Sequence, residues 1–248
     1  MEWREAGGLR WLEARLPGAQ VAFSTRVGGV SGAPFDSLNL GVLTDDDRDL
    51  VLENRRRLAA AIGLAVDRVV IGRQVHAAEL ALHGGPQQPG PFVQPGGAIP
   101  AVDGHVTVER DLPLLVFVAD CLPVALSGPG GVAMLHCGWR GLAAGIIARG
   151  VEATSATTAA IGPGIGPCCY EVGKEVLKAL GDAGDAAGST TVDLAAVAKR
   201  RLKSAGVQDI QTAGLCTSCE AELFFSHRRD AGRTGRQAGL VWRAGATS

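Results

Sequence analysis

Two spacings of hydrophobic residues run along the chain and predict its strands and helices. Short apolar runs bounded by Gly and Pro are typical of strands, whereas apolar residues that recur every three or four positions are typical of amphipathic helices. The first pattern predicts strands within residues 21–29, 68–76, 112–126, 131–138, 158–173 and 240–242. The second predicts helices within residues 45–64, 139–154 and 192–207.

The ends of the predicted helices carry capping signals. Acidic residues crowd the start of the first helix, and Gly63 ends it. In the third helix, Asp193 suits the N-cap and Gly206 lies at the stop. Strands and helices follow each other without a regular βαβ rhythm. The order of elements therefore favours an α+β fold with mixed sheets over a doubly wound parallel sheet.

Three segments depart from these periods. Pro123 interrupts the β-rich stretch 112–126. Residues 84–100 hold many Gly and Pro and no periodicity, so they form a loop that is either a lid over a binding site or a tolerated surface insertion. Residues 181–190 are of low complexity and are expected to be a spacer.

Composition excludes several classes of protein. The net charge is -1, which lacks the basic footprint of a nucleic-acid binder. Charged residues interrupt every apolar run near the N-terminus, so neither a signal peptide nor a membrane anchor is expected there. The apolar run 112–119 is too short to cross a bilayer and is expected to be a buried strand. A cytoplasmic protein with its 6 cysteines reduced is the resulting expectation.

His76, Cys121 and His136 are the candidate metal ligands. Each ends or follows a predicted strand, and strand ends of one sheet can meet in a single cleft. Two imidazoles and a thiolate suit zinc, and three protein ligands leave one position for water or substrate. A zinc-bound water ionises near neutral pH. The competing interpretation is that these side chains are simply packed or solvated at strand ends.

The same residues also suit a metal-free cysteine enzyme. Cys121 with His136 as its base would be a nucleophilic pair, and Asp120 would orient the histidine. Asp120 and Cys121 point to opposite faces in a regular strand, so this arrangement needs a turn before Pro123. One thiolate cannot serve both as a nucleophile and as a zinc ligand, so the two hypotheses compete.

Cys216 and Cys219 form a C-x-x-C pair. A structural zinc site needs four ligands, and the sequence holds no second such pair. The thioredoxin-like context of a redox dithiol is also missing. We therefore expect the pair to shape a loop, and a redox-responsive binding protein is the non-enzymatic alternative.

Arginines are the candidate anion binders. The glycine-rich stretch 161–169 resembles a phosphate cradle, but Pro163 and Pro167 remove two of its backbone donors. A guanidinium offers a planar fork to phosphate oxygens. Arg140 is the preferred candidate, because it follows His136 at a strand–helix turn. The other candidates are Arg26, Arg228 and Arg229.

Several motifs in the same order resemble one known family. They are FSTRVGGVSGAPFDSLNLG, ENRRRLA, QVHAAEL, VDGHVT, ADCLPVAL, HCGWRGLAAGI, IGPGIGPCCYEVG, CTSC and LFFSHRRDAGRTGRQAGLVW. The sequence is similar to the laccase-domain family, once called multicopper polyphenol oxidases and now described as purine nucleoside phosphorylases. The likeness runs through most of the chain, with small departures such as Cys137 where alanine is usual. The family implies a single domain over residues 1–248.

The resemblance implies a fold, an activity and a site. The fold is a layered α-β-β-α sandwich similar to the catalytic domain of cytotoxic necrotizing factors. The activities are phosphorolysis of adenosine, inosine and methylthioadenosine, and adenosine deamination, with purine nucleosides and phosphate as partners. The metal is zinc on His76, Cys121 and His136. The proposed catalytic residues are Arg140, Glu171 and Asp120, and the proposed substrate-binding residues are Asn39, Gln74, Arg26 and Arg228.

The older oxidase name can be tested by counting ligands. A four-copper laccase needs about ten histidines, because it combines a blue-copper site with a three-copper cluster. The chain has 5 histidines, so a true laccase is excluded. Copper at a single His₂Cys site stays possible, since copper outranks zinc in affinity. The alternatives kept open are this copper-bound oxidase and a cysteine hydrolase acting in peptidoglycan quality control, and a homodimer is a possible assembly.

Overall fold

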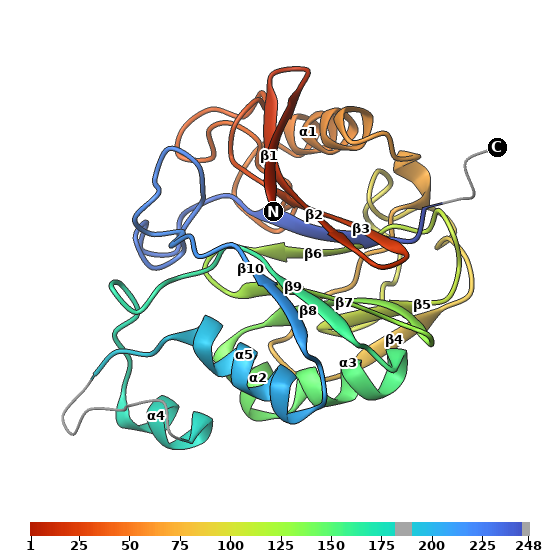
Figure 1. Cartoon of the computed structure of the whole chain (residues 1–248). Helices are drawn as coiled ribbons and strands as arrows, with labels where there is room; N and C mark the ends of the chain where they lie inside the picture. Colours follow the sequence, from red (N-terminus) through yellow and green to blue (C-terminus); the bar gives the residue numbers. More distant parts are fainter. Residues whose placement is uncertain (182–189, 245–248) are drawn as a thin grey trace.

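A computed structural model describes residues 1–181 and 190–244. The expected spacer lies, apart from its two end residues, outside the described residues. Figure 1 shows two sheets stacked between layers of helix. The helices are α1 Arg48–Ala61, α2 Trp139–Ala143, α3 Ile146–Thr154, α4 Lys174–Leu180 and α5 Leu194–Ser204, with a short 3₁₀ turn at Val66–Arg68.

Five strands form an antiparallel sheet in the order β1-β2-β3-β11-β6. The predicted first and last strands both belong to it and lie side by side, although they are more than 200 residues apart. The N-terminal hairpin that precedes them was not predicted. The strands are β1 Glu2–Ala6, β2 Leu9–Leu16, β3 Ala19–Ser24, β6 Leu114–Val118 and β11 Gln237–Trp242.

Six strands form a second, mixed sheet in the order β10-β9-β7-β8-β5-β4. Its two outer pairs are parallel, and its three inner pairs are antiparallel. Of the two sheets, this one therefore matches the expectation of a mixed sheet. The strands are β4 Leu80–His83, β5 Gly104–Thr107, β7 Leu122–Gly128, β8 Gly131–Cys137, β9 Thr158–Ile161 and β10 Asp209–Thr212.

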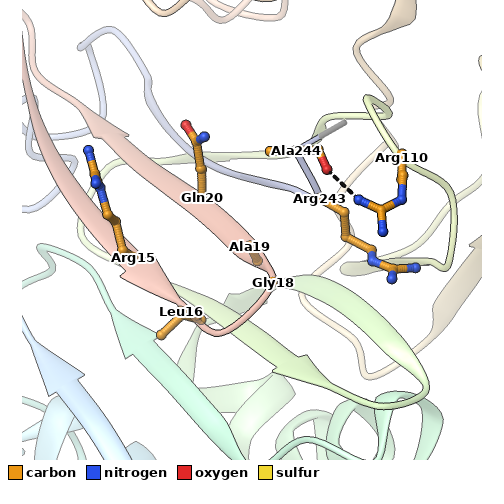
Figure 2. Close-up of a pocket in the computed structure, with 8 residues that line it drawn as sticks. All are labelled: Arg15, Leu16, Gly18, Ala19, Gln20, Arg110, Arg243 and Ala244. Atoms are coloured by element: carbon orange, nitrogen blue, oxygen red, sulfur yellow. Dashed lines mark hydrogen bonds between the residues drawn. The ribbon is translucent and has the colours of Figure 1, made fainter. Parts of the chain in front are cut away.

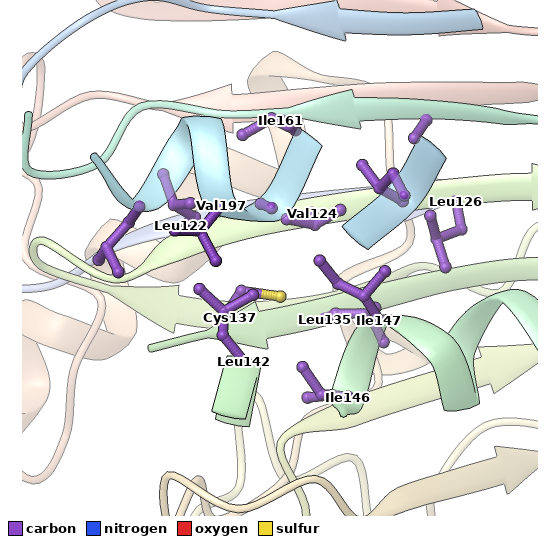
Figure 3. Packing of buried hydrophobic residues seen from close by; sticks show 14 of the residues in the cluster. Leu122, Val124, Leu126, Leu135, Cys137, Leu142, Ile146, Ile147, Ile161 and Val197 are labelled. Carbon is purple, nitrogen blue, oxygen red and sulfur yellow. The ribbon is translucent and has the colours of Figure 1, made fainter. Parts of the chain in front are cut away.

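Three apolar layers hold the four structural layers together. Between the sheets, Phe23 and Val116 of one sheet pack with Ala125 and Met134 of the other. Leu58 of α1 packs on the outer face of the first sheet. The outer face of the second sheet packs against α2, α3 and α5, as Figure 3 shows for residues such as Val124, Leu135, Ile147 and Val197. The observed order of layers is α-β-β-α, which confirms the predicted fold class.

The predicted strand 68–76 is wrong. Only Val70 forms a bridge, to Leu114, and the residues after it are irregular. The apolar pattern reflects burial rather than pairing with a strand. The backbone of Ile71, for example, bonds to the side-chain amide of Gln87 in the long loop, which donates to the Ile71 carbonyl and accepts from its N–H.

Two further boundaries differ from the sequence expectation. Pro123 lies inside β7 and pairs with His136 of β8, and the chain breaks earlier, between Val118 and Leu122. Its carbonyl accepts a hydrogen bond from the N–H of Gly162 at 2.9 Å, which ties this part of β7 to the residue after β9. The predicted helix 139–154 is two helices, since Gly145 between them has φ +87°.

The long loop 84–100 contains no regular element, as expected. Phe92 anchors it, because this ring is fully buried and stacks with Phe117 at a centroid distance of 6.5 Å. The guanidinium of Arg55 lies over both rings and donates to the Phe92 carbonyl at 2.7 Å. The loop is therefore joined to α1 through Arg55. In the part of the chain that the structure describes, no helix has the length and hydropathy needed to cross a membrane.

Candidate active site

Two neighbouring strands place two of the candidate ligands at one end of the second sheet. In the β7–β8 pair, Leu122 lies opposite Cys137 and Pro123 opposite His136. Cys121 directly precedes β7, so its thiol lies beside the His136 ring. His76 reaches the same place from the irregular segment after Val70, with φ +59°. The expected convergence of three distant side chains is therefore present.

The three side chains form a compact group. One ligand atom of each of His76, Cys121 and His136 lies within 4.8 Å of the others. The two imidazole rings meet edge to face, with centroids 4.9 Å apart and planes at 77°. His136 is buried, Cys121 is partly buried and His76 is exposed. The group is thus held from the protein side and is accessible to solvent on the side of His76.

Asp103 holds both histidines, and sequence reasoning missed it. Its Oδ1 lies 2.8 Å from Nδ1 of His136, which leaves Nε2 of that ring for the group. The same carboxylate accepts hydrogen bonds from the backbone N–H groups of Val75, His76 and Ala77 at 2.8–3.1 Å. Asp103 thereby fixes the strained backbone at His76. The only sequence signal was its place in the motif VDGHVT. Neither of its neighbours in the chain was a predicted site residue.

The environment of Cys121 favours the thiolate. Burial by itself raises its pKa, but the charges and hydrogen bonds of His136 and His76 outweigh burial and lower the pKa to about 6. Burial lowers the pKa of His136, but Cys121 and Asp103 outweigh it and raise the pKa to about 9. The thiolate is the form that binds metals and the form that attacks electrophiles. This environment therefore serves either of the two competing chemistries.

Cys137 does not join the group. It follows His136 on β8, so its side chain points to the opposite face of the sheet. Figure 3 shows the sulfur among the apolar side chains beneath the helices. Burial raises the pKa of this thiol, and Cys121 and Asp103 add to the effect. The extra thiol in this family motif is therefore part of the core rather than a ligand.

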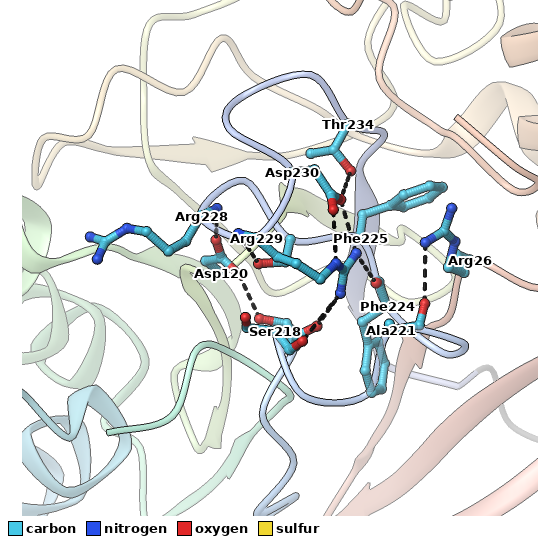
Figure 4. A network of polar contacts seen from close by, with 12 residues as sticks. Arg26, Asp120, Ser218, Ala221, Phe224, Phe225, Arg228, Arg229, Asp230 and Thr234 are labelled. Atoms are coloured by element: carbon cyan, nitrogen blue, oxygen red, sulfur yellow. Dashed lines mark hydrogen bonds and ion pairs between the residues drawn. The ribbon is translucent and has the colours of Figure 1, made fainter. Parts of the chain in front are cut away.

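Asp120 binds a neighbouring loop instead of His136. Its φ is +91°, and its carboxylate accepts from the Thr217 hydroxyl at 2.6 Å and from the Arg228 N–H at 2.7 Å. Figure 4 shows this network, which continues through Arg229 to Asp230. Asp103 thus takes the orienting place that the sequence suggested for Asp120. The turn required before Pro123 is present.

Two predicted arginines lie near the group. The guanidinium of Arg228 lies 5.1 Å from the ring centre of Tyr170 and donates to the Glu171 carbonyl at 2.6 Å. Arg140 is exposed, and its guanidinium lies 4.4 Å from the Trp139 ring centre. Burial and the charge of Cys121 raise the pKa of Tyr170 to about 12, while Arg228 and Arg140 oppose the rise. The pKa of Tyr170 therefore depends on the charges of Cys121 and of both arginines.

Arg236 is a third cation near the group, and it was not predicted. Burial lowers its pKa, and the negative charges of Cys121 and Asp120 oppose this effect. Its guanidinium donates only to backbone carbonyls, those of Thr234 and Gly235, among the contacts of the described residues. The motif GRTGRQAGL contains Arg236, but nothing in the sequence distinguished it from other basic residues.

The remaining predicted residues lie in other networks. Asn39 is fully buried, and its amide bonds to Thr44, Asp46 and the Gly41 and Arg236 backbone. The amide of Gln74 pairs with both backbone groups of Phe117. Arg26 forms an ion pair with Asp36 at 3.1 Å. Asn39 thus reaches the site only through the backbone of Arg236.

Glu171 is exposed, and its backbone pairs with Thr191. A cavity of about 600 Å³ is lined by Arg26, Ala33, Pro34, Asp36, Asp230 and Arg233. A cavity of about 350 Å³, shown in Figure 2, is lined by Arg15, Leu16, Gly18, Ala19, Gln20, Arg110, Arg243 and Ala244.

The cavity in Figure 2 lies far from the His–Cys–His group. Ser127, near the end of β7 opposite to Cys121, donates to the Pro17 carbonyl at 2.7 Å. Pro17 belongs to the same β2–β3 turn as Gly18, which lines the cavity. The arginines of this cavity are therefore at the other end of the sandwich and do not contribute to the site.

The donor set fits a metal ion. Two imidazoles and one thiolate match zinc, and an open fourth position is typical of catalytic rather than structural zinc. A metal-binding histidine commonly donates its second ring nitrogen to a carboxylate, as His136 does to Asp103. The five histidines do not converge, since His83 and His105 pair with each other at 3.0 Å. The site offers ligands for one ion, and a cluster of copper ions is excluded.

Comparison with known proteins adds independent evidence. Purine nucleoside phosphorylase YlmD of Geobacillus stearothermophilus is 37% identical, over 97% of this chain and 96% of that protein. A purine nucleoside phosphorylase of Deinococcus radiodurans is 39% identical, over 95% of this chain and 94% of that protein. The crystal structure of YlmD from G. stearothermophilus superposes with a TM-score of 0.87 at 36% identity, covering 98% of both chains.

A second solved structure agrees with the first. The crystal structure of the Bacillus licheniformis hypothetical protein YfiH superposes with a TM-score of 0.86 at 31% identity, covering 97% of this chain and 98% of that one. The family model described as multi-copper polyphenol oxidoreductase laccase matches residues 20–244. The chain belongs to this laccase-like family, whose curated relatives include the purine nucleoside phosphorylases YlmD and YfiH.

Proposed function

We propose that this protein is a purine nucleoside phosphorylase that cleaves adenosine, inosine and methylthioadenosine. One observation carries the proposal: His76, Cys121 and His136 converge within 4.8 Å beside the cations Arg140, Arg228 and Arg236. The names of the relatives support purine nucleoside phosphorolysis in general. A catalytic cluster next to several cations suits a reaction in which an anion attacks a sugar.

The proposed reaction exchanges a base for phosphate. A phosphate oxygen forms a bond with C1′ of the ribose while the bond from C1′ to the purine nitrogen breaks. The bonding pair leaves with the purine, which takes up a proton, and the products are the free base and ribose 1-phosphate. The methylthio analogue follows the same course. The protein must therefore hold an anion and assist the departure of a base.

Arginines and acids of the site fit these two tasks. Arg140 and Arg228 would hold the phosphate through charge-assisted hydrogen bonds, and Arg236 is placed to add a third positive charge. Glu171 is the proposed acid that protonates the departing purine, because it follows Tyr170, whose pKa responds to the charge of Cys121. Asp120 would act by holding the backbone of Arg228, to which its carboxylate is already bonded.

The metal of the proposal is zinc, held by His76, Cys121 and His136. When bound, zinc supplies a Lewis acid that polarises a substrate group. The chain's own part is to orient the ligands. Asp103 fixes the tautomer of His136 and the backbone of His76, and the solvent-exposed side of His76 leaves room for a nucleoside. Adenosine deamination is the proposed second activity, since His and Cys zinc sites also serve purine and pyrimidine deaminases.

Product analysis with variants tests the proposal. Purified protein is incubated with adenosine and phosphate, and adenine, inosine and ribose 1-phosphate are quantified. His76→Ala is expected to abolish base release. Arg140→Ala is expected to lower kcat/KM for phosphate about 10–100-fold, the equivalent of one charge-assisted contact. Arg56→Ala, on the exposed face of α1, is the matched control. Full activity in Arg140→Ala would remove its assigned role.

A cysteine hydrolase is the second candidate, and one observation favours it. Asp103, His136 and Cys121 form a chain of contacts in which the carboxylate orients the imidazole and the imidazole lowers the pKa of the thiol. Treatment of metal-free protein with a thiol alkylator separates the candidates. Loss of an amidase activity on peptidoglycan fragments, with no zinc requirement, would favour the hydrolase over the phosphorylase.

A further inference from the structure

Four cysteines outside the active site converge on one point. Cys168 and Cys169 lie in the loop after β9, and Cys216 and Cys219 lie in the loop after β10. Their four Sγ atoms all lie within 4.8 Å of one another, and Cys219 is 3.5 Å from both Cys168 and Cys169. The sequence showed only one C-x-x-C pair. The fold supplies the missing two thiols from an adjacent Cys-Cys pair, which a search for spaced pairs overlooks.

The spacing of the sulfurs matches that of a tetrahedral metal site. A zinc–thiolate bond of about 2.3 Å puts the four sulfurs about 3.8 Å apart. The sulfurs here lie at that separation within about 1 Å, so a small adjustment completes the tetrahedron. Sulfurs of a disulfide lie at about 2 Å, and all four thiols are free. The arrangement is that of four ligands around a common centre.

The backbone around Cys216 is built to hold a thiolate. The N–H of Gly166 donates to Cys216 Sγ at 3.1 Å, and the N–H groups of Ser218 and Cys219 also bond to this sulfur. Gly166 has no side chain, and a Cβ there would lie 3.2–3.4 Å from Cys216 and the Cys168 sulfur. Three amide donors partly offset the negative charge of this sulfur. Four thiolates around a divalent ion carry a net negative charge, so such donors stabilise the site.

The two loops also frame the active site. The Gly164 and Leu215 backbones bond to each other, and Thr217 donates to the Gly164 carbonyl at 3.0 Å. Ile165 donates to the Asp120 carbonyl at 2.8 Å, and the Thr217 hydroxyl donates to the Asp120 carboxylate. A contact that holds the two loops together would therefore also stabilise the turn that carries Asp120 and Cys121. Cys168 and Cys219 are exposed, so an ion can enter from solvent.

We propose that Cys168, Cys169, Cys216 and Cys219 bind one zinc ion as a structural tetrathiolate site, separate from the His76, Cys121 and His136 group. Each thiol that is protonated releases its proton to solvent when its sulfur binds the ion, and no electron is transferred. Four protein ligands close the coordination shell, so the role is structural rather than catalytic. The ion joins the loop after β9 to the loop after β10.

Zinc content of the full-length protein tests the site without altering it. The His76→Ala variant removes a ligand of the other group only. We expect this variant, purified without chelator, to retain about one zinc per chain by elemental analysis. X-ray absorption at the zinc edge is expected to show four sulfur neighbours at about 2.3 Å. Absence of zinc from this variant, or a shell dominated by nitrogen and oxygen, overturns the proposal.

A matched set of variants locates the ion. Cys219→Ser and Cys168→Ser alter exposed thiols, and each is expected to lose one zinc equivalent relative to the wild type. Cys137→Ser alters a buried thiol of the core and is expected to keep the full zinc content. The double variant His76→Ala, Cys219→Ser is expected to be zinc-free. Unchanged zinc content in both exposed-thiol variants contradicts the proposal.

A thiol count tests the alternative that the cluster holds a disulfide instead of a metal ion. Denatured, metal-free protein handled anaerobically is expected to show 6 reactive thiols. A count of 4, with an intact mass lower by two hydrogens, would assign a disulfide to the cluster and overturn the metal site. Chelation is expected to expose Cys168 and Cys219 to alkylation first, and added zinc is expected to protect them. Equal alkylation rates with and without zinc contradict the proposal.

Discussion

Asp103 links the two histidines of the site through a single side chain. Its carboxylate bonds to the His136 ring and to three consecutive backbone N–H groups around His76, and it is fully buried. Burial alone raises its pKa, but His136 and the backbone donors outweigh burial and lower it. The carboxylate therefore stays charged, and the His136 ring and the His76 backbone are fixed before any ligand binds.

Asp103→Asn tests this role. The amide offers one acceptor oxygen in place of two, so either His136 Nδ1 or the backbone N–H groups on the other oxygen lose their acceptor. Metal affinity at the His76, Cys121 and His136 group is expected to fall about 10–100-fold, which is typical of losing such a supporting carboxylate. Competition with a fluorescent zinc chelator measures it. Asp120→Asn is the control, because Asp120 bonds to Thr217 and Arg228 instead. Equal affinities in the two variants would contradict the assignment.

The residues that sequence could identify share one property. His76, Cys121 and His136 are rare residue types at the ends of apolar runs, so their chemistry and their position both pointed to a site. Asp103 and Arg236 are common residue types, and their roles come from contacts with distant segments. The amides of Asn39 and Gln74 bond to neighbours that only the fold reveals, and their role in substrate binding stays a prediction.

At the scale of elements, glycine conformation sets the boundary that periodicity missed. The apolar pattern runs through 139–154 without interruption, but Gly145 has φ +87° and separates α2 from α3. The left-handed backbone redirects the chain so that Ile146 and Ile147 pack beneath the sheet. Periodicity records which residues are buried and not the direction of the helix axis. The same limit explains segment 68–76, whose buried residues follow no strand.

Gly145→Ala isolates the backbone cost of this boundary. A Cβ at Gly145 would meet no atom within 4 Å, so only the left-handed conformation opposes the substitution. The free energy of unfolding is expected to fall by about 1–2 kcal/mol, measured by urea denaturation. Gly84→Ala is the control, because that glycine also meets nothing within 4 Å and lacks a positive φ. It is expected to be neutral or slightly stabilising. Equal effects in both variants would contradict the strain argument.

At the scale of the whole molecule, the sandwich separates the site from the basic cavity of Figure 2. The sheets approach closely where Gly239 faces Pro123, since a Cβ on Gly239 would lie 2.4 Å from the Pro123 Cβ.

Irregular alternation of elements was enough to predict α+β, and the family motifs indicated the layers. The strand order was beyond sequence reasoning, because β11 and β3 pair across more than 200 residues. The single-domain organisation stays a prediction.

A buried histidine ties the stability of the whole fold to pH. His105 of β5 is fully buried against His83, and no described residue bonds to its Nε2. Burial lowers its pKa to about 3, and His83 adds to this effect while Asp103 opposes it. In the unfolded chain, the His105 ring binds a proton below about pH 6.5. In the folded chain, the same ring stays neutral down to about pH 3. Acidification through this window therefore favours unfolding.

The free energy of unfolding is accordingly expected to fall between pH 6 and pH 4, with a contribution from His105 of up to about 1.4 kcal/mol per pH unit. His105→Gln removes the titrating group while keeping a side chain that can bond to His83. Its unfolding free energy is expected to be lower than that of the wild type at pH 7 but to depend less steeply on pH. Urea denaturation at half-unit steps of pH measures both slopes. Parallel pH profiles would show that His105 does not couple folding to protonation, and the acid sensitivity would then belong to other groups.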